Sequence, residues 1–524
     1  MTKETELDLS ATKKWFGNLF RKTESHALKT EHKTESSAKM EAHEHNIEHS
    51  ESKHHQTKTS EETIDLSGVT QKIRNIFKAE KDHKHDKEDT VQFNPRQAWK
   101  TILKYNAVIL ILIAIILSAY LRAMPWNMPI TDTWAKDTLY NNIKGQLSAQ
   151  INSKYPHMGA AQKNQMLEAD FQKAIEGAGP QLTEQIKAQS EYFKSRFRTP
   201  EGDHMLLDID SYAYYRETWN FVTYGHLGNA IINGTPWDTF VLAPLGIPPG
   251  DNFHIHLGAW MYKIWHAMDP SVTLLKTMFW LPFLIALLAP IPAFFIGRKF
   301  AGTIGGFFAA LYTAINPGTL ARTSAGVPDT DVYSIVFPLL ILWAYLEAYD
   351  SNTNKKRWIW AALGGLFTGL YAWAWSGWWH VFFIALGGTV AYMIGHAILN
   401  YKTQPELIKK SLITTGIILG VYFLTSAIFV TAFRDAHFFV DSVQQPFQFM
   451  MIQQAAKDSM WPNVYTTVAE LNTVDIAGIV GSVGGWTYVF IALAGVLFAM
   501  TKKDEDGNYD FKFGLILLFW IAAT

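Results

Sequence analysis

The sequence contains no cysteine among its 524 residues. This absence excludes disulfide bonds, thiolate metal sites and cysteine nucleophiles, although it does not identify the compartment. Excess charge of one sign is missing as well, since 46 Lys and Arg are balanced by 47 Asp and Glu for a formal net charge of -1. Nothing in this balance points to a strongly charged partner, and we expect no nucleic acid to bind.

Long hydrophobic runs are missing from residues 1–99, which are rich in Lys, Glu, Ser, Thr and His. A segment of this composition buries too little apolar surface to offset the entropy lost on ordering. We therefore expect residues 1–99 to form a disordered tail. No cleavable signal peptide is visible, because the first apolar run begins too late in the chain.

From residue 100 onward the chain is dominated by apolar runs, several of them close to the roughly 20 residues that span a bilayer. This pattern predicts an all-α polytopic membrane protein. The predicted spans lie at about 102–121, 272–296, 304–319, 332–348, 358–375, 379–399, 412–433, 476–500 and 513–524.

The apolar run over residues 253–268 is interrupted by several histidines and a lysine. It is short and polar for a span, so we predict an interfacial or re-entrant segment. With this choice the basic turns between spans all face the cytoplasm, as the positive-inside rule requires. The tail is then cytoplasmic, and large outer loops fall at about 123–271, 320–331 and 434–475 of a multi-pass protein of the cell membrane.

Acidic residues gather in these three outer loops, within the runs 208–216, 322–331 and 466–470. Carboxylates from separate loops at one membrane face suit a hard divalent cation such as Mg²⁺ or Mn²⁺, which prefers oxygen ligands and leaves positions open for a phosphorylated substrate. Asp329 and Asp331 alone are weak evidence, because two acids beside a helix start are often only a cap. The combination of three runs strengthens the metal hypothesis.

Three motifs in this order resemble the catalytic subunit of oligosaccharyltransferase in its archaeal or bacterial single-subunit form. They are Asp210 followed by Ser-Tyr-Ala, the run Arg-Thr-x-x-Gly-x-x-Asp-Thr-Asp ending at Asp331, and Thr-Val-Ala-Glu ending at Glu470. The resemblance implies a multi-span bundle of the GT-C type. It also implies a glycosyltransferase that moves an oligosaccharide from a polyprenyl phosphate or diphosphate carrier to the Asn amide of Asn-x-Ser/Thr in acceptor proteins.

The resemblance further implies roles for individual residues. Asp210, Asp329 and Glu470 match the metal ligands and catalytic carboxylates, and Asp331 matches a further ligand or its neighbour. Arg322 matches the arginine that braces the second acidic loop. An Asn amide is a poor nucleophile because its nitrogen lone pair is delocalised. Asp210 and Glu470 together would accept both amide N–H bonds and free that lone pair, with Mn²⁺ or Mg²⁺ as the cofactor.

Two departures from the family accompany this resemblance. The motif Trp-Trp-Asp-Tyr-Gly, which recognises the acceptor Ser/Thr, and the soluble C-terminal domain do not occur in the sequence. We expect a chain truncated before that domain and inactive alone. The alternatives left open are a protein mannosyltransferase or other lipid-sugar transferase, a secondary transporter, and an inactive fragment.

His254 and His256 form a separate weak signal. As His-x-His they could ligate zinc from one face of a strand, but a histidine pair in an outer loop is more often solvated. We therefore interpret them as solvated.

Overall fold

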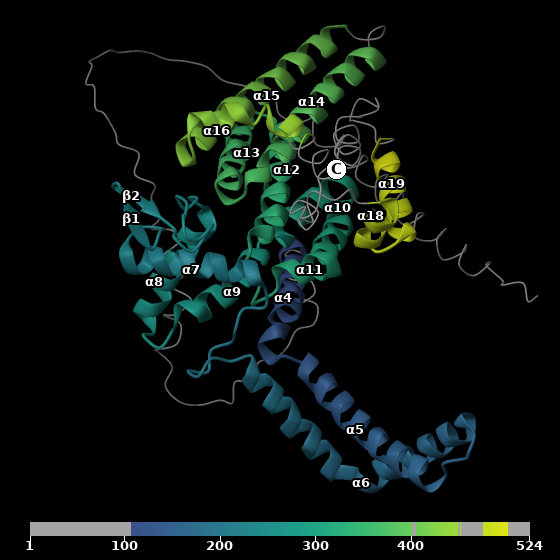
Figure 1. Cartoon of the computed structure of the whole chain (residues 1–524). Helices are drawn as coiled ribbons and strands as arrows, with labels where there is room; N and C mark the ends of the chain where they lie inside the picture. The colour runs from purple at the N-terminus through teal and green to yellow at the C-terminus, as the bar shows by residue number, and fades with distance from the viewer. Residues whose placement is uncertain (1–105, 401–404, 449–450, 452–474, 501–524) are drawn as a thin grey trace, which may run out of the picture. The chain divides into compact units, whose positions relative to one another are not determined.

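The computed structural model describes residues 106–400, 405–448, 451 and 475–500, all of which belong to one compact unit, residues 93–524 (Figure 1). The predicted tail, the predicted span at 513–524 and Glu470 lie outside the described residues. Within the described residues, helices dominate and a two-stranded antiparallel hairpin is the only sheet. The predicted all-α class is confirmed.

The elements are α4 (Asn106–Asn127), α5 (Ile130–Lys154), α6 (Ala160–Arg196), α7 (Ile209–Tyr224), β1 (Ala230–Ile232), β2 (Thr235–Trp237), α8 (Phe253–Met268), α9 (Leu274–Ala286), α10 (Pro290–Ile315), α11 (Pro317–Thr323), η1 (Thr330–Val332), α12 (Tyr333–Asp350), α13 (Asn354–Ala374), η2 (Ser376–Trp378), α14 (Trp379–Asn400), α15 (Pro405–Phe433), α16 (Ala436–Asp441), α18 (Ile476–Val483) and α19 (Trp486–Met500).

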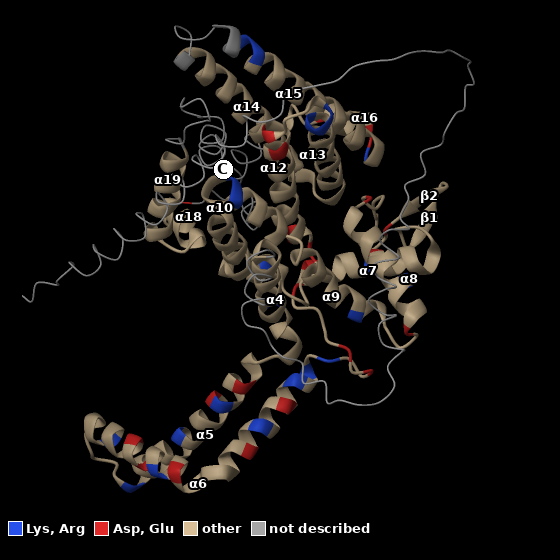
Figure 2. Ribbon diagram, turned by 180° about the vertical axis from the view of Figure 1, so that it is seen from behind, with Lys and Arg blue, Asp and Glu red and all other residues tan. Residues whose placement is uncertain are grey.

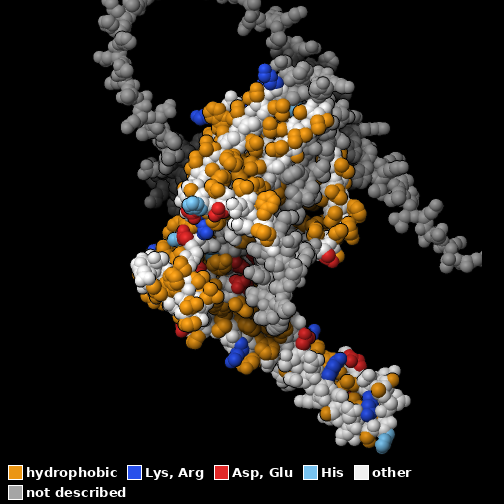
Figure 3. Space-filling model, turned by 45° about the horizontal axis from the view of Figure 1, so that its top comes forward, with side chains coloured by type: hydrophobic (Ala, Val, Ile, Leu, Met, Phe, Trp, Pro, Cys, Tyr) orange, Lys and Arg blue, Asp and Glu red, His pale blue; other side chains and the backbone are white. Residues whose placement is uncertain are grey.

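Five segments of the described chain are long and apolar enough to cross a membrane, or up to six if the bent pair α18 and α19 forms one span. A multi-pass membrane protein is thereby confirmed. Hydrophobic side chains cover much of the visible face of the helical bundle (Figure 3). Helix α8, with 16 residues, is not among the five. Helix α13 is not among them either, so the predicted span at 358–375 stays a prediction.

The longest apolar segment, Leu274–Ile315, contains a reversal of the chain inside α10. Its backbone leaves helical geometry at Ala301 and Gly302, where φ of Gly302 is +65°. A methyl group built on Gly305 would lie 3.1 Å from the carbonyl oxygen of Gly297, and one built on Gly306 would lie 2.7 Å from that of Phe294. Such closeness is impossible along a straight helix, which rises 1.5 Å per residue. The two halves therefore fold back on each other, as predicted for two spans.

The core of the bundle lies among α12, α13, α14 and α15. Glycines let α13 and α15 approach closely, because a methyl group on Gly369 would meet Phe429 at 2.4 Å. The hydroxyl groups of Thr368 and Tyr422 lie 2.9 Å apart between these two helices. Side chains of Tyr333, Tyr345 and the other buried residues of this cluster fill the interior. This packing holds the ends of the helices, and thus the loops between them, in fixed positions.

The segment between α4 and α7 is an antiparallel helical pair, α5 and α6. Lys144 forms an ion pair of 2.9 Å with Glu168 across the pair, and Thr131 and Ser190 lie 2.8 Å apart through their hydroxyl oxygens. Acidic and basic residues alternate along both helices, unlike those of the bundle (Figure 2). The pair is therefore suited to water rather than to lipid.

Candidate functional site

Two of the predicted acidic residues lie at the start of α7. Asp208 is the N-cap position and Asp210 lies in the first turn of the helix, where carboxylates interact favourably with the helix dipole. The helix ends at Gly225, whose φ of +78° is the left-handed conformation that suits glycine. The side chain of Asp208 is partly buried, whereas that of Asp210 is exposed. The start of α7 thus offers two carboxylates separated by a single residue.

The third carboxylate comes from the loop between α11 and α12. Asp329 is the N-cap of η1, and its side chain accepts a hydrogen bond from the backbone N–H of Thr330. The loop before it is bound by three backbone hydrogen bonds to other elements: Ala325 N–H donates to Arg122 O at 2.9 Å, Gly326 N–H donates to Phe279 O at 2.7 Å, and Leu207 N–H donates to Gly326 O at 2.7 Å. The position of Asp329 is therefore fixed relative to α4, α9 and the residue that precedes Asp208.

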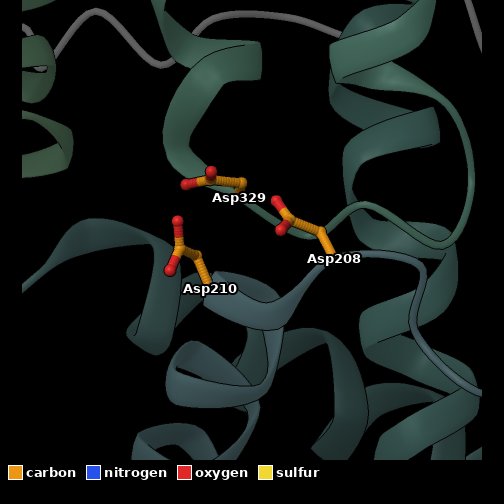
Figure 4. Close-up of side chains that lie close together, drawn as sticks. All are labelled: Asp208, Asp210 and Asp329. Atoms are coloured by element: carbon orange, nitrogen blue, oxygen red, sulfur yellow. The ribbon is translucent and has the colours of Figure 1, made fainter. Parts of the chain in front are cut away.

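Asp208, Asp210 and Asp329 form one cluster, in which one carboxylate oxygen from each lies within 4.8 Å of the others. Figure 4 shows the three side chains converging on a common space from the start of α7 and from the loop before α12. Asp210 and Asp329 are brought together as predicted, although more than 100 residues separate them in the sequence. Their proximity requires an even number of membrane crossings between them. That α8 stays out of the membrane remains a prediction.

The electrostatics of this cluster favour a bound cation. Burial raises the pKa of Asp329 above its ordinary value, and the negative charges of Asp331 and Asp208 raise it further, while the hydrogen bonds from Thr330 act in the opposite direction. Three carboxylates at this spacing repel one another unless a proton or a cation intervenes. Oxygen ligands of this kind match Mg²⁺ or Mn²⁺ in chemistry.

Asp331 lies apart from the three-carboxylate cluster. Its Oδ2 atom forms an ion pair of 3.2 Å with Nη1 of Arg322, at the end of α11. Both side chains are partly exposed, so the pair contributes little to stability by itself. It does connect the two ends of the loop that carries Asp329.

The interpretation of His254 as a solvated loop residue is wrong. It lies on a helix, α8, and its side chain is fully buried because α8 packs its polar start against the acidic loop. Nε2 lies 3.0 Å from the carbonyl oxygen of Pro328, and Nδ1 lies 3.1 Å from the hydroxyl of Tyr333. A carbonyl can only accept, so Nε2 carries the hydrogen and Nδ1 accepts from Tyr333. Burial accordingly lowers the pKa of His254 to about 4.

The interpretation of His256 as solvated is also wrong, because its side chain lies where α8 meets the ends of α13 and α15. It lies one turn from the start of α8, and its Nε2 is 2.5 Å from Oδ1 of Asp251. The indole N–H of Trp373 donates to Oδ2 of the same aspartate at 3.2 Å, and Arg434 donates to its carbonyl oxygen. Asp251 thus joins α8 to the ends of α13 and α15.

A buried arginine supports the acidic loop from the other side. Arg122, at the end of α4, is 1% exposed. Its Nε donates to Oγ1 of Thr323 at 2.9 Å, and Nη1 donates to Ser118 Oγ at 2.7 Å and to Ala314 O at 2.8 Å. The guanidinium therefore satisfies carbonyl oxygens at the end of α10. It holds α4, α10 and α11 together directly below the loop.

A polar cavity of about 280 Å³ lies beside the cluster. It shares Thr330 with the Asp329 loop and Tyr214 with α7, and Glu217 lines it one turn further along that helix. Burial raises the pKa of Glu217 to about 7, with Asp238 adding to the rise and Arg216 opposing it.

Sequence reasoning missed three residues of this site. Asp208 lies two positions before Asp210 in the same Asp-x-Asp pattern, and this spacing was the signal that could have identified it. His254 and Arg122 gave no such signal, because their roles depend on packing between segments far apart in the chain. Glu470, a predicted ligand, lies outside the described residues.

Comparisons with known proteins bear on this arrangement. The family model described as oligosaccharyl transferase STT3, N-terminal, matches residues 182–520. A relative from Methanococcus voltae, named dolichyl-phosphooligosaccharide-protein glycotransferase, is 29% identical over 382 residues, which cover 66% of this chain and 42% of that protein. A relative of the same name from Methanocaldococcus jannaschii is 24% identical over 417 residues, covering 64% of this chain and 45% of that protein.

The chain spans about half the length of the curated relatives it matches. Among solved structures, that of the Archaeoglobus fulgidus oligosaccharyltransferase in the apo form is similar, with 17% identity and a TM-score of 0.41. That similarity covers 61% of this chain and 44% of the other chain.

Proposed function

Because this chain belongs to the STT3 family of oligosaccharyl transferases, we propose that it is the catalytic membrane part of a glycosyltransferase for protein N-glycosylation. It moves an oligosaccharide from a polyprenyl phosphate or diphosphate carrier to the side-chain amide of Asn in Asn-x-Ser/Thr. Residues 100–524 form the catalytic membrane domain, with the active site on the extracytoplasmic face and the tail in the cytoplasm. The relatives' printed name, a dolichyl-phosphooligosaccharide-protein glycotransferase, supports this choice.

One observation carries the proposal: carboxylates from two distant segments, Asp208 with Asp210 and Asp329, meet at one end of the bundle. A transfer from a phosphorylated carrier needs neutralisation of the leaving phosphate, and a bound divalent metal ion supplies this as a Lewis acid. The chemistry of the donor set fits Mn²⁺ or Mg²⁺. Asp208, Asp210 and Asp329 would hold the ion, with Glu470 as a further ligand.

The chain's own residues also prepare the acceptor amide. Asp210 is exposed, so one of its oxygens can accept an N–H bond from an incoming Asn side chain. Glu470 would accept the second N–H bond. Two charge-assisted bonds of this kind, each roughly twice as strong as a neutral one, oppose the delocalisation of the nitrogen lone pair. The nitrogen would then attack the sugar carbon as the bond from that carbon to the carrier phosphate breaks, and one of the two carboxylates would accept the proton that the nitrogen loses.

The remaining residues keep these groups in place. Arg322 and Asp331 brace the loop through their ion pair of 3.2 Å. His254 holds the carbonyl of Pro328, one residue before Asp329. Water-excluding contacts around His254 and Tyr333 keep that loop rigid, so the carboxylate positions do not have to be ordered when substrates arrive.

The test is transfer of glycan to a peptide containing Asn-x-Thr, in membranes carrying the chain, lipid-linked oligosaccharide and Mn²⁺. Asp210→Asn should lower kcat at least a hundredfold with a small change in the peptide KM, since the lost bonds act mainly in the transition state. A peptide with Gln in place of Asn is the acceptor control.

Two further measurements separate the parts of the proposal. Mn²⁺ binding to the purified chain, followed by paramagnetic resonance, tests the cluster without requiring turnover. Metal binding without transfer would indicate that this length of chain lacks parts needed for activity. The metal site itself would be contradicted if the chain bound no Mn²⁺, or if substitution of Asp210 or Asp329 left Mn²⁺ binding unchanged.

A further inference from the structure

A second polar cavity lies at the end of the bundle opposite the carboxylates. It has a volume of about 270 Å³ and is lined by residues from the adjoining ends of α12, α13, α14 and α15. Helix α12 begins four residues after Asp329, and Tyr349, its last residue but one, lines this cavity. Its 18 residues span roughly 27 Å, close to the thickness of a hydrocarbon core. The cavity therefore lies at the other membrane surface.

The lining of this cavity combines cations with hydroxyl groups. Arg357 lies in the first turn of α13 and Lys410 in the early part of α15. Figure 2 shows basic residues at the beginning of α15. The other lining residues all carry hydroxyl groups: Tyr349, Tyr392, Ser411, Thr414 and Thr415. Among the described residues, no carboxylate lines the cavity, so its charge is positive.

Arg357 carries a donor that the protein leaves unused. Its Nη1 donates to Oδ1 of Asn354 at 3.1 Å, which orients the guanidinium. Its Nε is buried and, among the described residues, has no hydrogen-bond partner. A buried donor without an acceptor is costly and rare in proteins. An acceptor from a ligand in the cavity would satisfy it.

The N-terminal ends of α13 and α15 add to this field, because helix N-termini carry partial positive charge. Arginine with hydroxyl donors is the usual combination for a phosphate group. Basic pockets between the ends of membrane helices bind anionic headgroups of the adjoining leaflet.

We propose that this cavity binds a phosphate group at the membrane face opposite the catalytic carboxylates, held by Arg357, Lys410 and the hydroxyls of α15. The ligand chemistry is a phosphate monoanion or diester. It comes either from an anionic lipid of that leaflet or from free phosphate in the adjoining compartment. Because the cavity lies across the membrane from the site of transfer, this inference goes beyond the proposed function and does not depend on it.

The test uses the purified full chain in lipid nanodiscs and in detergent. Bound lipid is counted by native mass spectrometry, and unfolding is followed by tryptophan fluorescence. With phosphatidylglycerol we expect a retained lipid and a rise in Tm of several degrees, and with phosphatidylcholine a much smaller effect. Arg357→Gln with Lys410→Gln should weaken the retention at least tenfold.

The matched control is Lys355→Gln with Lys356→Gln, which also removes two positive charges, both from the first turn of α13, but from side chains that do not line the cavity. Lys410→Gln alone shows whether weaker lipid retention can arise without loss of the fold, because the Lys410 side chain is exposed and its substitution should not disturb packing. Its unliganded Tm should equal that of the wild type.

Three outcomes decide the proposal. Stabilisation by phosphatidylglycerol but not by millimolar inorganic phosphate identifies a lipid headgroup. Equal stabilisation by inorganic phosphate alone, lost in the Arg357 and Lys410 variant, identifies free phosphate. If neither probe binds, the cavity is not a phosphate site. The same conclusion follows if the Arg357 and Lys410 double variant retains the probe as well as the wild type and the Lys355 and Lys356 control do.

Discussion

The backbone N–H of Leu207 donates to the carbonyl oxygen of Gly326 at 2.7 Å. This bond links the segment that ends in Asp208 to the loop that ends in Asp329, so it couples the two halves of the carboxylate cluster. Gly326 has a φ of +94°, and a methyl group there would lie 2.8 Å from Phe279 and 3.0 Å from Leu207. Only glycine fits this backbone conformation and this close approach without strain.

Gly326→Ala should therefore separate the two halves of the cluster. We expect the free energy of unfolding to fall by about 1–3 kcal/mol and Mn²⁺ affinity to fall at least tenfold. Thermal unfolding measures the change in stability, and isothermal titration with Mn²⁺ measures the change in affinity. Gly145→Ala in α5, where a methyl group meets nothing within 4 Å, is the control and should leave both unchanged. Unaltered metal affinity in Gly326→Ala would contradict the coupling of the loops.

Asp329 and Asp331 should differ in their importance, although they are two residues apart. Asp329→Asn removes a member of the cluster, so Mn²⁺ affinity should fall more than tenfold. Asp331→Asn breaks the exposed ion pair with Arg322, which is worth about 0–1 kcal/mol, and leaves the three-carboxylate cluster complete, so it should lower affinity by a few fold at most. Arg322→Gln should match Asp331→Asn, and the double variant should be no worse than either. Equal losses from Asp329→Asn and Asp331→Asn would place Asp331 in direct contact with the metal.

Much of the fold follows from the sequence because apolar run length and the distribution of basic residues are local signals. The reversal near Gly302 lies between the predicted spans 272–296 and 304–319. Counting crossings predicts only that Asp210 and Asp329 share one membrane face, once α8 is left out of the membrane. The burial of His254 could not be predicted, because it depends on where Pro328 and Tyr333 lie after the bundle has formed.

His254 should make stability depend on pH. Its pKa is about 4 in the folded chain, below the ordinary value of about 6.5. The unfolded chain therefore binds more protons between these values, and stability is fully present above pH 6.5 and lost as pH falls towards 4. The upper limit of the loss is about 3 kcal/mol. Thermal unfolding of the wild type and of His254→Gln between pH 4 and 8 measures it.

The Gln variant is chosen because its amide can still donate to Pro328 O without titrating. It should show a flatter pH profile while retaining most of the Mn²⁺ affinity. His254→Ala, which leaves Pro328 O and Tyr333 OH without their partner, should lose both stability and affinity. A pH profile of His254→Gln identical to that of the wild type would assign the acid sensitivity to another group.

Glu217 should give a pH dependence of the opposite sign. Burial raises its pKa to about 7 in the folded chain, so the folded chain binds more protons than the unfolded chain between about pH 4.5 and 7. Stability is then present at low pH and falls as pH rises through this window. The limit is about 3 kcal/mol, reduced by the part of the side chain that remains accessible to water.

Glu217→Gln should remove this fall in stability and raise Tm at pH 8. Glu176→Gln, an exposed position on α6, should not. If Tm at pH 8 were unchanged in Glu217→Gln, the carboxylate would already be compensated, and Arg216, whose charge lowers its pKa, would be the residue to substitute next.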